Sequence, residues 1–160
     1  MRVRRLSGRD FRRYRTFDVE LAPGLTVIRG PNEAGKTTMQ RALELALTRR
    51  ATSAAGELEA LRPWGAPPEV RSLITIEFEQ DEEDGKKVGT LEKTFAGSKG
   101  TVKLDYEGQS ITDPSLADQV MAELTGIPSE GFFRSTASVD RKSTRLNSSH
   151  ALLSRMPSSA

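Results

Sequence analysis

The apolar residues near the start of the chain recur with a period of two, the spacing of a strand with one buried face. Apolar and acidic side chains alternate over residues 17–21, which predicts a strand there. The run LTVIR at 25–29 is continuous and β-branched, as in strands buried on both faces. Residues 1–11, where Val3 and Leu6 stand among arginines, predict an edge-like strand.

The spacing then changes to that of amphipathic helices. The first apolar stripe has the helical spacing i, i+3, i+4, i+7 and i+8 and consists of Met39, Ala42, Leu43, Ala46 and Leu47. A second helix is predicted after Asp113, a residue type that caps helix N-termini, with Pro114 at its first position and Gly126 just past its end. Its predicted stripe is Leu116, Val120 and Leu124.

Between the two helices the period of two returns and predicts an antiparallel meander with one face in water. Ile74, Ile76 and Phe78 alternate with polar residues, and a turn is expected at Asp84-Gly85. The segments VGTLEKTF and TVKLDYEG supply the next strands, the second with Val102, Leu104 and Tyr106 on one face. The segment IPSEGFFRSTASV, at 127–139, predicts a short turn and one further strand.

A connector rich in small residues and proline occupies residues 49–70. Its prolines forbid a long helix, although a short one is predicted at Glu57 to Leu61. Trp64, in the sequence RPWG, either faces a ligand or anchors its loop to the core, and anchoring is the commoner use of such a side chain.

The character of the sequence changes at Asp140, where a stretch rich in Ser and Arg begins without apolar periodicity. Residues 140–160 resemble the translation of a sequencing adapter, because Asp140 to His150 and Ser154 to Ala160 match it in frame on both sides of a variable index. The alternative is a disordered Ser/Arg-rich tail. We therefore expect one domain at 1–139 and an artefactual or disordered tail at 140–160.

Charge and composition disfavour several classes of function. The formal net charge is +2, but the tail carries four of the 24 basic residues and one of the 22 acidic ones, so the remainder has a net charge of −1. We therefore expect no general nucleic-acid footprint on 1–139, and we interpret the arginines near the start as solvating an edge strand. The chain has no cysteine and its one histidine, His150, lies in the tail, so neither thiolate metal sites nor histidine catalysis is expected in 1–139.

Targeting signals are also missing from the sequence. The N-terminus lacks the apolar stretch of a signal peptide, and no apolar run approaches the roughly 20 residues of a membrane span. These features predict a cytoplasmic protein that does not engage a membrane.

The stretch GPNEAGKTT, at 30–38, carries the strongest chemical signal. Gly30, Gly35, Lys36 and Thr37 satisfy G-x-x-x-x-G-K-[ST], the phosphate-binding loop. Its glycines let backbone N–H groups converge on phosphate oxygens, and the following helix adds its positive N-terminal dipole. Lys36 is expected to neutralise the β- and γ-phosphates, Thr37 to ligate Mg²⁺ and Thr38 to contact the α-phosphate.

The residues around this loop are similar to the N-terminus of the SMC/SbcC-type ATPases, the ABC-related repair and chromosome-maintenance family that includes RecF and RecN. The similarity covers about residues 1–48 and includes Asp10-Phe11-Arg12 where the family has Asn-Phe-Arg. It implies an α/β fold, the N-terminal lobe of an ABC-type P-loop head, with a mixed sheet around the loop helix and an antiparallel β-subdomain. It also implies that ATP is the ligand and that Arg12 approaches it. The residues expected to wrap the triphosphate are Gly30, Asn32, Glu33, Ala34, Gly35, Lys36, Thr37 and Thr38.

The resemblance further implies the activity of an intact parent protein. Two heads would sandwich two ATP molecules, and hydrolysis would be coupled to DNA double-strand break repair or chromosome maintenance, with DNA and a nuclease subunit as candidate partners. The glutamine that senses Mg²⁺ would follow Val139, and the signature motif, the Walker B carboxylates and the coiled coil do not occur in the sequence. No catalytic set is complete in this chain, so we expect it to bind ATP without turning it over.

Other interpretations stay open. A transporter-type ABC ATPase subunit shares the loop, although the arginine-rich strands disfavour it. A small P-loop kinase is disfavoured because the chain does not begin at the loop strand. A non-catalytic nucleotide-binding module fits the chain as it stands, and nucleotide-dependent self-association without phosphate release would identify it.

Overall fold

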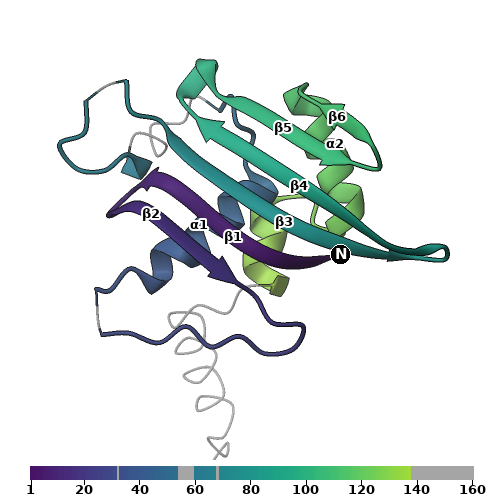
Figure 1. Ribbon diagram of the computed structural model, residues 1–160. Helices are drawn as coiled ribbons and strands as arrows, with labels where there is room; N and C mark the ends of the chain where they lie inside the picture. Colours follow the sequence, from purple (N-terminus) through teal and green to yellow (C-terminus); the bar gives the residue numbers. More distant parts are fainter. Residues whose placement is uncertain (32, 54–59, 68, 138–160) are drawn as a thin grey trace, which may run out of the picture.

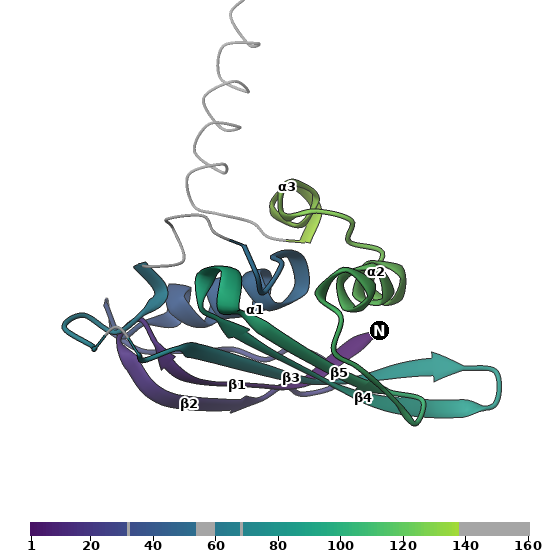
Figure 2. The ribbon, with the colours of Figure 1, turned by 90° about the horizontal axis from the view of Figure 1, so that it is seen from above.

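The computed structural model describes residues 1–31, 33–53, 60–67 and 69–137, and in it one antiparallel sheet carries its helices on a single face (Figures 1 and 2). The strand order is β2-β1-β3-β4-β5-β6. The strands are β1 (Arg2–Phe11), β2 (Tyr14–Glu20), β3 (Ser72–Glu82), β4 (Gly85–Phe95), β5 (Thr101–Tyr106) and β6 (Gln109–Ile111). The helices are α1 (Lys36–Thr48), η2 (Gly97–Lys99), α2 (Pro114–Thr125), α3 (Glu130–Phe132) and η3 (Phe133–Ala137). The expected tail at 140–160 and most of the expected helix at 57–61 lie outside the described residues.

The predicted meander is confirmed in β3, β4 and β5. Ile74, Ile76 and Phe78 are completely buried, and their polar neighbours in β3 lie on the opposite face. Ile76 pairs with Leu91 of β4, and Leu91 pairs in turn with Leu104 of β5. Because side chains alternate between the two faces of a strand, this register brings the buried residues of neighbouring strands together under the helices.

Strand β1 is an interior strand, so the expectation that it forms an edge is wrong. It pairs antiparallel with β2 on one side and with β3 on the other. Its arginines form ion pairs across the sheet: Arg2 binds Glu79 at 2.8 Å, and Arg5 binds Asp18 on β2. The arginines therefore match carboxylates on both neighbouring strands, which the spacing along β1 alone does not reveal.

Residues 25–29 form no strand, although their sequence predicts one buried on both faces. Leu25 is 86% exposed, and Val27 and Ile28 are also exposed. A strand is stable only where a neighbour accepts its backbone hydrogen bonds, and no pairing of these residues occurs within the described part of the chain. The apolar character of the run is real, but the sheet described here does not cover it.

Helix α1 follows the predicted apolar stripe and buries a wider arc. Ala42, Leu45 and Ala46 are almost completely buried against the sheet, and Leu47 is also buried. Leu45 was not in the predicted stripe, because a helix that packs on a sheet with neighbours on both sides buries more than one narrow seam.

Helix α2 begins and ends as predicted. The Leu116 N–H donates to Asp113 Oδ1 at 2.8 Å, and Gly126 adopts the left-handed conformation at φ 67° after the last turn. The buried positions, however, are Ala117 and Met121, whereas Leu116 is exposed. The helix is thus rotated from the predicted orientation, which brings its small alanine toward the sheet.

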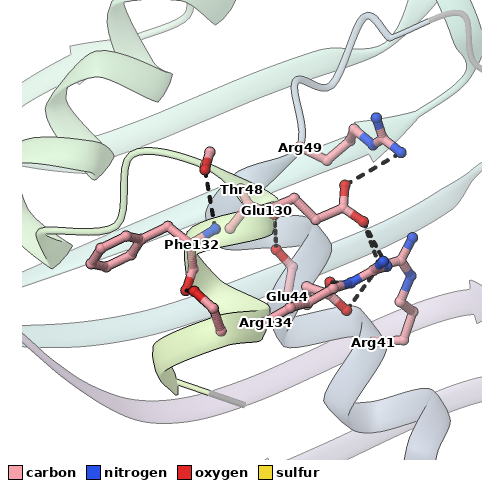
Figure 3. A network of polar contacts seen from close by, with 9 residues as sticks. Arg41, Glu44, Thr48, Arg49, Glu130, Phe132 and Arg134 are labelled. Atoms are coloured by element: carbon pink, nitrogen blue, oxygen red, sulfur yellow. Dashed lines mark hydrogen bonds and ion pairs between the residues drawn. The ribbon is translucent and has the colours of Figure 1, made fainter. Parts of the chain in front are cut away.

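The segment after α2 is helical, so the strand predicted within 127–139 does not form where the structure describes it. The Phe132 N–H donates to Ser129 Oγ, which caps the short α3. Ion pairs then hold α3 and η3 against α1, as Figure 3 shows. Local capping and these charges, rather than the apolar pattern, decide the conformation.

Glu44 and Glu130 are the centres of this ion-pair network. Arg41 bridges them, with Nη1 at 2.8 Å from Glu44 Oε2 and at 2.9 Å from Glu130 Oε1. Arg134 also contacts both carboxylates, at 2.5 and 2.7 Å, and Arg49 approaches Glu130. Burial alone would raise the pKa of Glu130, but its hydrogen bond from Arg41 and the nearby charges lower it overall. The network therefore ties residues 130–134 to the loop helix while the carboxylate stays ionised.

Within the described ranges, no helix has the length and apolar character needed to cross a bilayer.

A buried lysine connects the sheet with two helices. Lys93, on β4, is 1% exposed, and its Nζ donates to the Arg49 carbonyl at 2.8 Å and to Asp118 Oδ1 at 2.7 Å. Burial lowers the pKa of Lys93, and Asp118 opposes this effect. A cation at this depth is tolerated because its carboxylate and carbonyl partners replace water.

We predict that Asp118→Ala lowers the free energy of unfolding by about 3 kcal/mol, because it leaves the buried Lys93 ammonium without its carboxylate. Lys93→Met should cost less, since methionine fills the same space and Asp118 keeps Arg50 at 3.5 Å. Urea denaturation followed by circular dichroism measures both losses. Lys103→Met, on the exposed side of β5, is the control and should change stability by less than about 0.5 kcal/mol. Equal losses for the two buried variants would contradict this account.

The Glu79 carboxylate predicts a pH dependence of stability. Hydrogen bonds from Arg2 and Lys86 lower its pKa from 4.5 to about 2. Because the folded state holds the ionised form, Glu79 stabilises the fold fully above its unfolded pKa and progressively less as the pH falls toward 2. Glu79→Gln should therefore lower the melting temperature at neutral pH, and the difference from wild type should shrink between pH 4.5 and 2. A difference that stays constant across this range would refute the assignment.

Candidate functional site

The phosphate-binding motif forms the start of α1. Gly35 is the N-cap residue, in the left-handed conformation at φ 93°, and Lys36 begins the helix. No side chain caps this end, and the first turn contains no acidic residue. A helix N-terminus with uncapped N–H groups and no carboxylate in its first turn is favourable for an anion.

Lys36 folds back on the loop that precedes it. Its Nζ donates to the Gly30 carbonyl at 2.7 Å and to the Pro31 carbonyl at 2.6 Å. These bonds bring the first glycine of the motif beside its lysine, as the motif requires. An arriving phosphate would have to compete with two carbonyl oxygens for the same ammonium group.

Tyr14 supports the loop from the sheet, a contact that the sequence analysis missed. Its hydroxyl donates to the Ala34 carbonyl at 2.5 Å, and its ring packs with Phe17, centroid to centroid, at 5.6 Å. A side chain at position 35 would collide with the Tyr14 ring, so Gly35 is required both by its positive φ and by this close approach. Tyr14 is the first residue of β2, just after the β1–β2 turn. This position was the only feature of the sequence that could have indicated its contact with the loop.

The other predicted loop residues occupy different environments. Thr37 is exposed, so its hydroxyl is accessible from solvent, whereas the Thr38 side chain is buried. Glu33 adopts a positive φ of 66°, which bends the loop before Ala34. Asn32 lies outside the described residues. The roles of these residues toward a triphosphate remain predictions.

Arg12 lies in the β1–β2 turn, at the rim of a cavity of about 470 Å³. Its backbone has φ 54°, and its N–H donates to the Leu61 carbonyl at 2.5 Å. Arg13, Arg62 and Trp64 line the same cavity. The Trp64 side chain is fully exposed, so the expectation that it anchors its loop to the core is wrong. No described contact joins Arg12 to the glycine loop directly; the link runs through Tyr14.

The residues present fit a phosphate group with Mg²⁺. The uncapped start of α1 and the Lys36 ammonium are anion-binding groups, and the Thr37 hydroxyl is free to face a cation. In the described part of the chain, no cluster of three or more His, Cys, Asp or Glu residues could hold a metal ion by itself. A magnesium ion here would therefore depend on Thr37 together with phosphate oxygens and water.

Comparisons with known proteins show the family of the chain. The family model described as AAA domain matches residues 5–150. The DNA replication and repair protein RecF of Roseiflexus castenholzii is 42% identical over 81 residues, which are 48% of this chain and 21% of that protein. RecF of Herpetosiphon aurantiacus is 33% identical over 150 residues, covering 81% of this chain and 39% of that protein. The chain thus spans well under half the length of these relatives.

A solved structure shares the fold. It comes from work on the ATP-driven dimerization and DNA stimulated activation of SMC ATPases, and it superposes with a TM-score of 0.53 at 18% identity. The alignment covers 91% of this chain and 96% of that one. The predicted α/β fold class is therefore confirmed. The chain belongs to the AAA domain family, and its resemblance to the SMC and RecF-type P-loop ATPases is confirmed.

Proposed function

We propose that residues 30–38 bind ATP with Mg²⁺. The observation that carries this proposal is the uncapped N-terminus of α1, which follows a glycine loop whose lysine lies beside its first glycine. Backbone N–H groups and the helix dipole favour a phosphate at this point. Membership of the AAA domain family supports the same ligand.

Each residue of the loop then has a distinct task. Lys36 would exchange its two carbonyl partners for phosphate oxygens, which are stronger acceptors because they are charged. Thr37 would offer its hydroxyl to Mg²⁺, which prefers oxygen ligands. Tyr14 would hold the Ala34 peptide in place while Lys36 moves. Magnesium-bound ATP would supply the phosphoryl group that a complete site transfers to water.

In the intact protein we infer ATP hydrolysis coupled to DNA repair or chromosome maintenance. Hydrolysis needs a group that orients water, and no apolar strand of this sequence ends in the Asp-Glu pair that serves this purpose in the similar family. The solved relative comes from work on ATP-driven dimerization and DNA stimulated activation, which supports pairing of two heads around ATP. DNA and a second head are therefore the proposed partners.

The exposed run at 25–29 supports a larger domain. Leu25, Val27 and Ile28 are apolar and exposed, directly before the loop, although this composition suits a buried strand. The RecF relatives are much longer than the part that matches here. We propose that strands of the remaining domain pair with this run and hold the glycine loop from its other side.

We predict that Lys36→Ala weakens ATP binding at least tenfold, because it removes a charge-assisted bond to the phosphates. Isothermal titration calorimetry of the whole chain with Mg-ATP measures the loss. Lys103→Ala removes an exposed lysine on β5 and is the matched control, which should bind ATP as the wild type does. Unchanged affinity in Lys36→Ala would show that the loop is not the site.

We predict that Thr37→Val removes the magnesium dependence of ATP binding, because valine keeps the branched shape and lacks the hydroxyl ligand. The measurement compares the ATP dissociation constant in Mg²⁺ and in EDTA for each variant. Thr37→Ser, which keeps the hydroxyl, should retain the wild-type ratio. If Thr37→Val also retains it, magnesium is held without this side chain.

A further inference from the structure

The cavity at the β1–β2 turn combines cationic groups with an aromatic ring. Arg12, Arg13 and Arg62 are among the residues that line it, and so is Trp64. Its volume of about 470 Å³ is within the range of pockets that hold small organic ligands. Guanidinium groups suit phosphate and also stack on planar rings, so the lining matches a planar, phosphorylated ligand.

Trp64 is the unusual member of this lining. Tryptophan is mostly buried in folded proteins, yet this indole is fully exposed, and no described aromatic pair includes it. An exposed indole beside arginines is the arrangement with which proteins stack nucleobases. Because the ring is not packed in the core, both of its faces are accessible to a ligand.

The cavity and the glycine loop adjoin the same turn. The Arg12 N–H holds the Leu61 carbonyl, at the start of the segment that carries Trp64, while the Tyr14 hydroxyl holds the Ala34 carbonyl in the loop. Arg12 lies in the turn itself, and Tyr14, two residues later, is the first residue of β2. Figure 1 shows this turn at the end of the sheet, between residues 60–66 and the start of α1. The cavity and the glycine loop are therefore tied to one turn.

We propose that Trp64 stacks on the base of the nucleotide whose phosphates lie in the glycine loop, with Arg12 and Arg13 lying between the base and the phosphates. This inference rests on the proposed function, because it assigns a base site to the same ligand. It makes Trp64 the residue that distinguishes a nucleotide from bare polyphosphate. The same base chemistry is offered by a free nucleotide and by a nucleic-acid strand, and we favour the nucleotide because the loop and the cavity are both tied to the β1–β2 turn.

The test uses the intrinsic fluorescence of the chain, in which Trp64 is the single tryptophan. Mg-ATP should quench its emission and saturate at the dissociation constant found by equilibrium dialysis. Inorganic tripolyphosphate with Mg²⁺ should bind the loop without quenching, because it has no base. Lys36→Ala should abolish quenching by ATP, since the phosphates then lose their site.

Affinity gives a second, independent readout. Trp64→Ala should weaken ATP about tenfold and leave tripolyphosphate unchanged, whereas Trp64→Phe should bind ATP nearly as the wild type does. Lys103→Ala, remote from the cavity, should alter neither ligand. Equal weakening of ATP and tripolyphosphate in Trp64→Ala would show a merely structural role and would overturn the base site.

The possible outcomes separate the two proposals. If dialysis shows ATP binding but the emission and the Trp64→Ala affinity do not change, the base site is wrong and the phosphate loop stands. If neither ATP nor tripolyphosphate binds, both proposals fail together. If a single-stranded oligonucleotide quenches Trp64 equally in wild type and Lys36→Ala while ATP does not, the indole serves a nucleic-acid strand and our assignment is overturned.

Discussion

Helix α1 packs Ala42, Leu45 and Ala46 on the antiparallel sheet, and this contact fixes the position of the phosphate loop and of residues 130–134. At its N-terminus, the helix presents uncapped N–H groups at a point set by the sheet through Tyr14. Along its side, it carries the carboxylate and arginines that dock residues 130–134. A shift of α1 on the sheet would move the phosphate site and the docked segment together.

The N-terminal arginines show that strand register decides which charges of a sequence are paired and which are exposed to solvent. In the sequence they form a basic cluster that resembles a solvated edge. In the sheet Arg2 is paired with Glu79 and Arg5 with Asp18, and Arg4 also approaches Glu79. These cross-strand ion pairs neutralise much of the positive charge that would attract a nucleic-acid phosphate. The arginines that remain outside these pairs include Arg12 and Arg13, which lie at the cavity near the loop.

Elements with a local cause could be predicted from the sequence. The strands of the meander follow from alternation, and α2 follows from Asp113, Pro114 and Gly126, whose effects act within one turn. The glycine loop was predictable because its motif encodes backbone geometry. Each of these features depends on residues close together in the chain.

Elements with a distant cause could not be predicted in this way. Residues 25–29 are apolar enough for a strand, but a strand also needs a neighbour that the pattern cannot supply. The helical turns at 130–137 depend on Arg41 and Glu44, about ninety residues away in sequence. The burial of Lys93 could not be predicted from its neighbours in sequence. It depends on Asp118 and the Arg49 carbonyl, which are distant in the chain and accept its hydrogen bonds. In the site, Tyr14 was missed for the same reason.

The two hydrogen bonds of Lys36 to its own loop determine how the site would bind a phosphate. Its ammonium is already held by two carbonyls of its own loop, so phosphate binding is an exchange of partners rather than the filling of a void. Such an exchange favours the phosphate only if the released carbonyls find water and the loop keeps its shape. Gly30 and Pro31 are exposed, so water reaches their carbonyls, and the Tyr14 bond to Ala34 maintains the loop from the sheet side. Solvent access to the two carbonyls and the Tyr14 bond therefore keep the free energy needed for this exchange small.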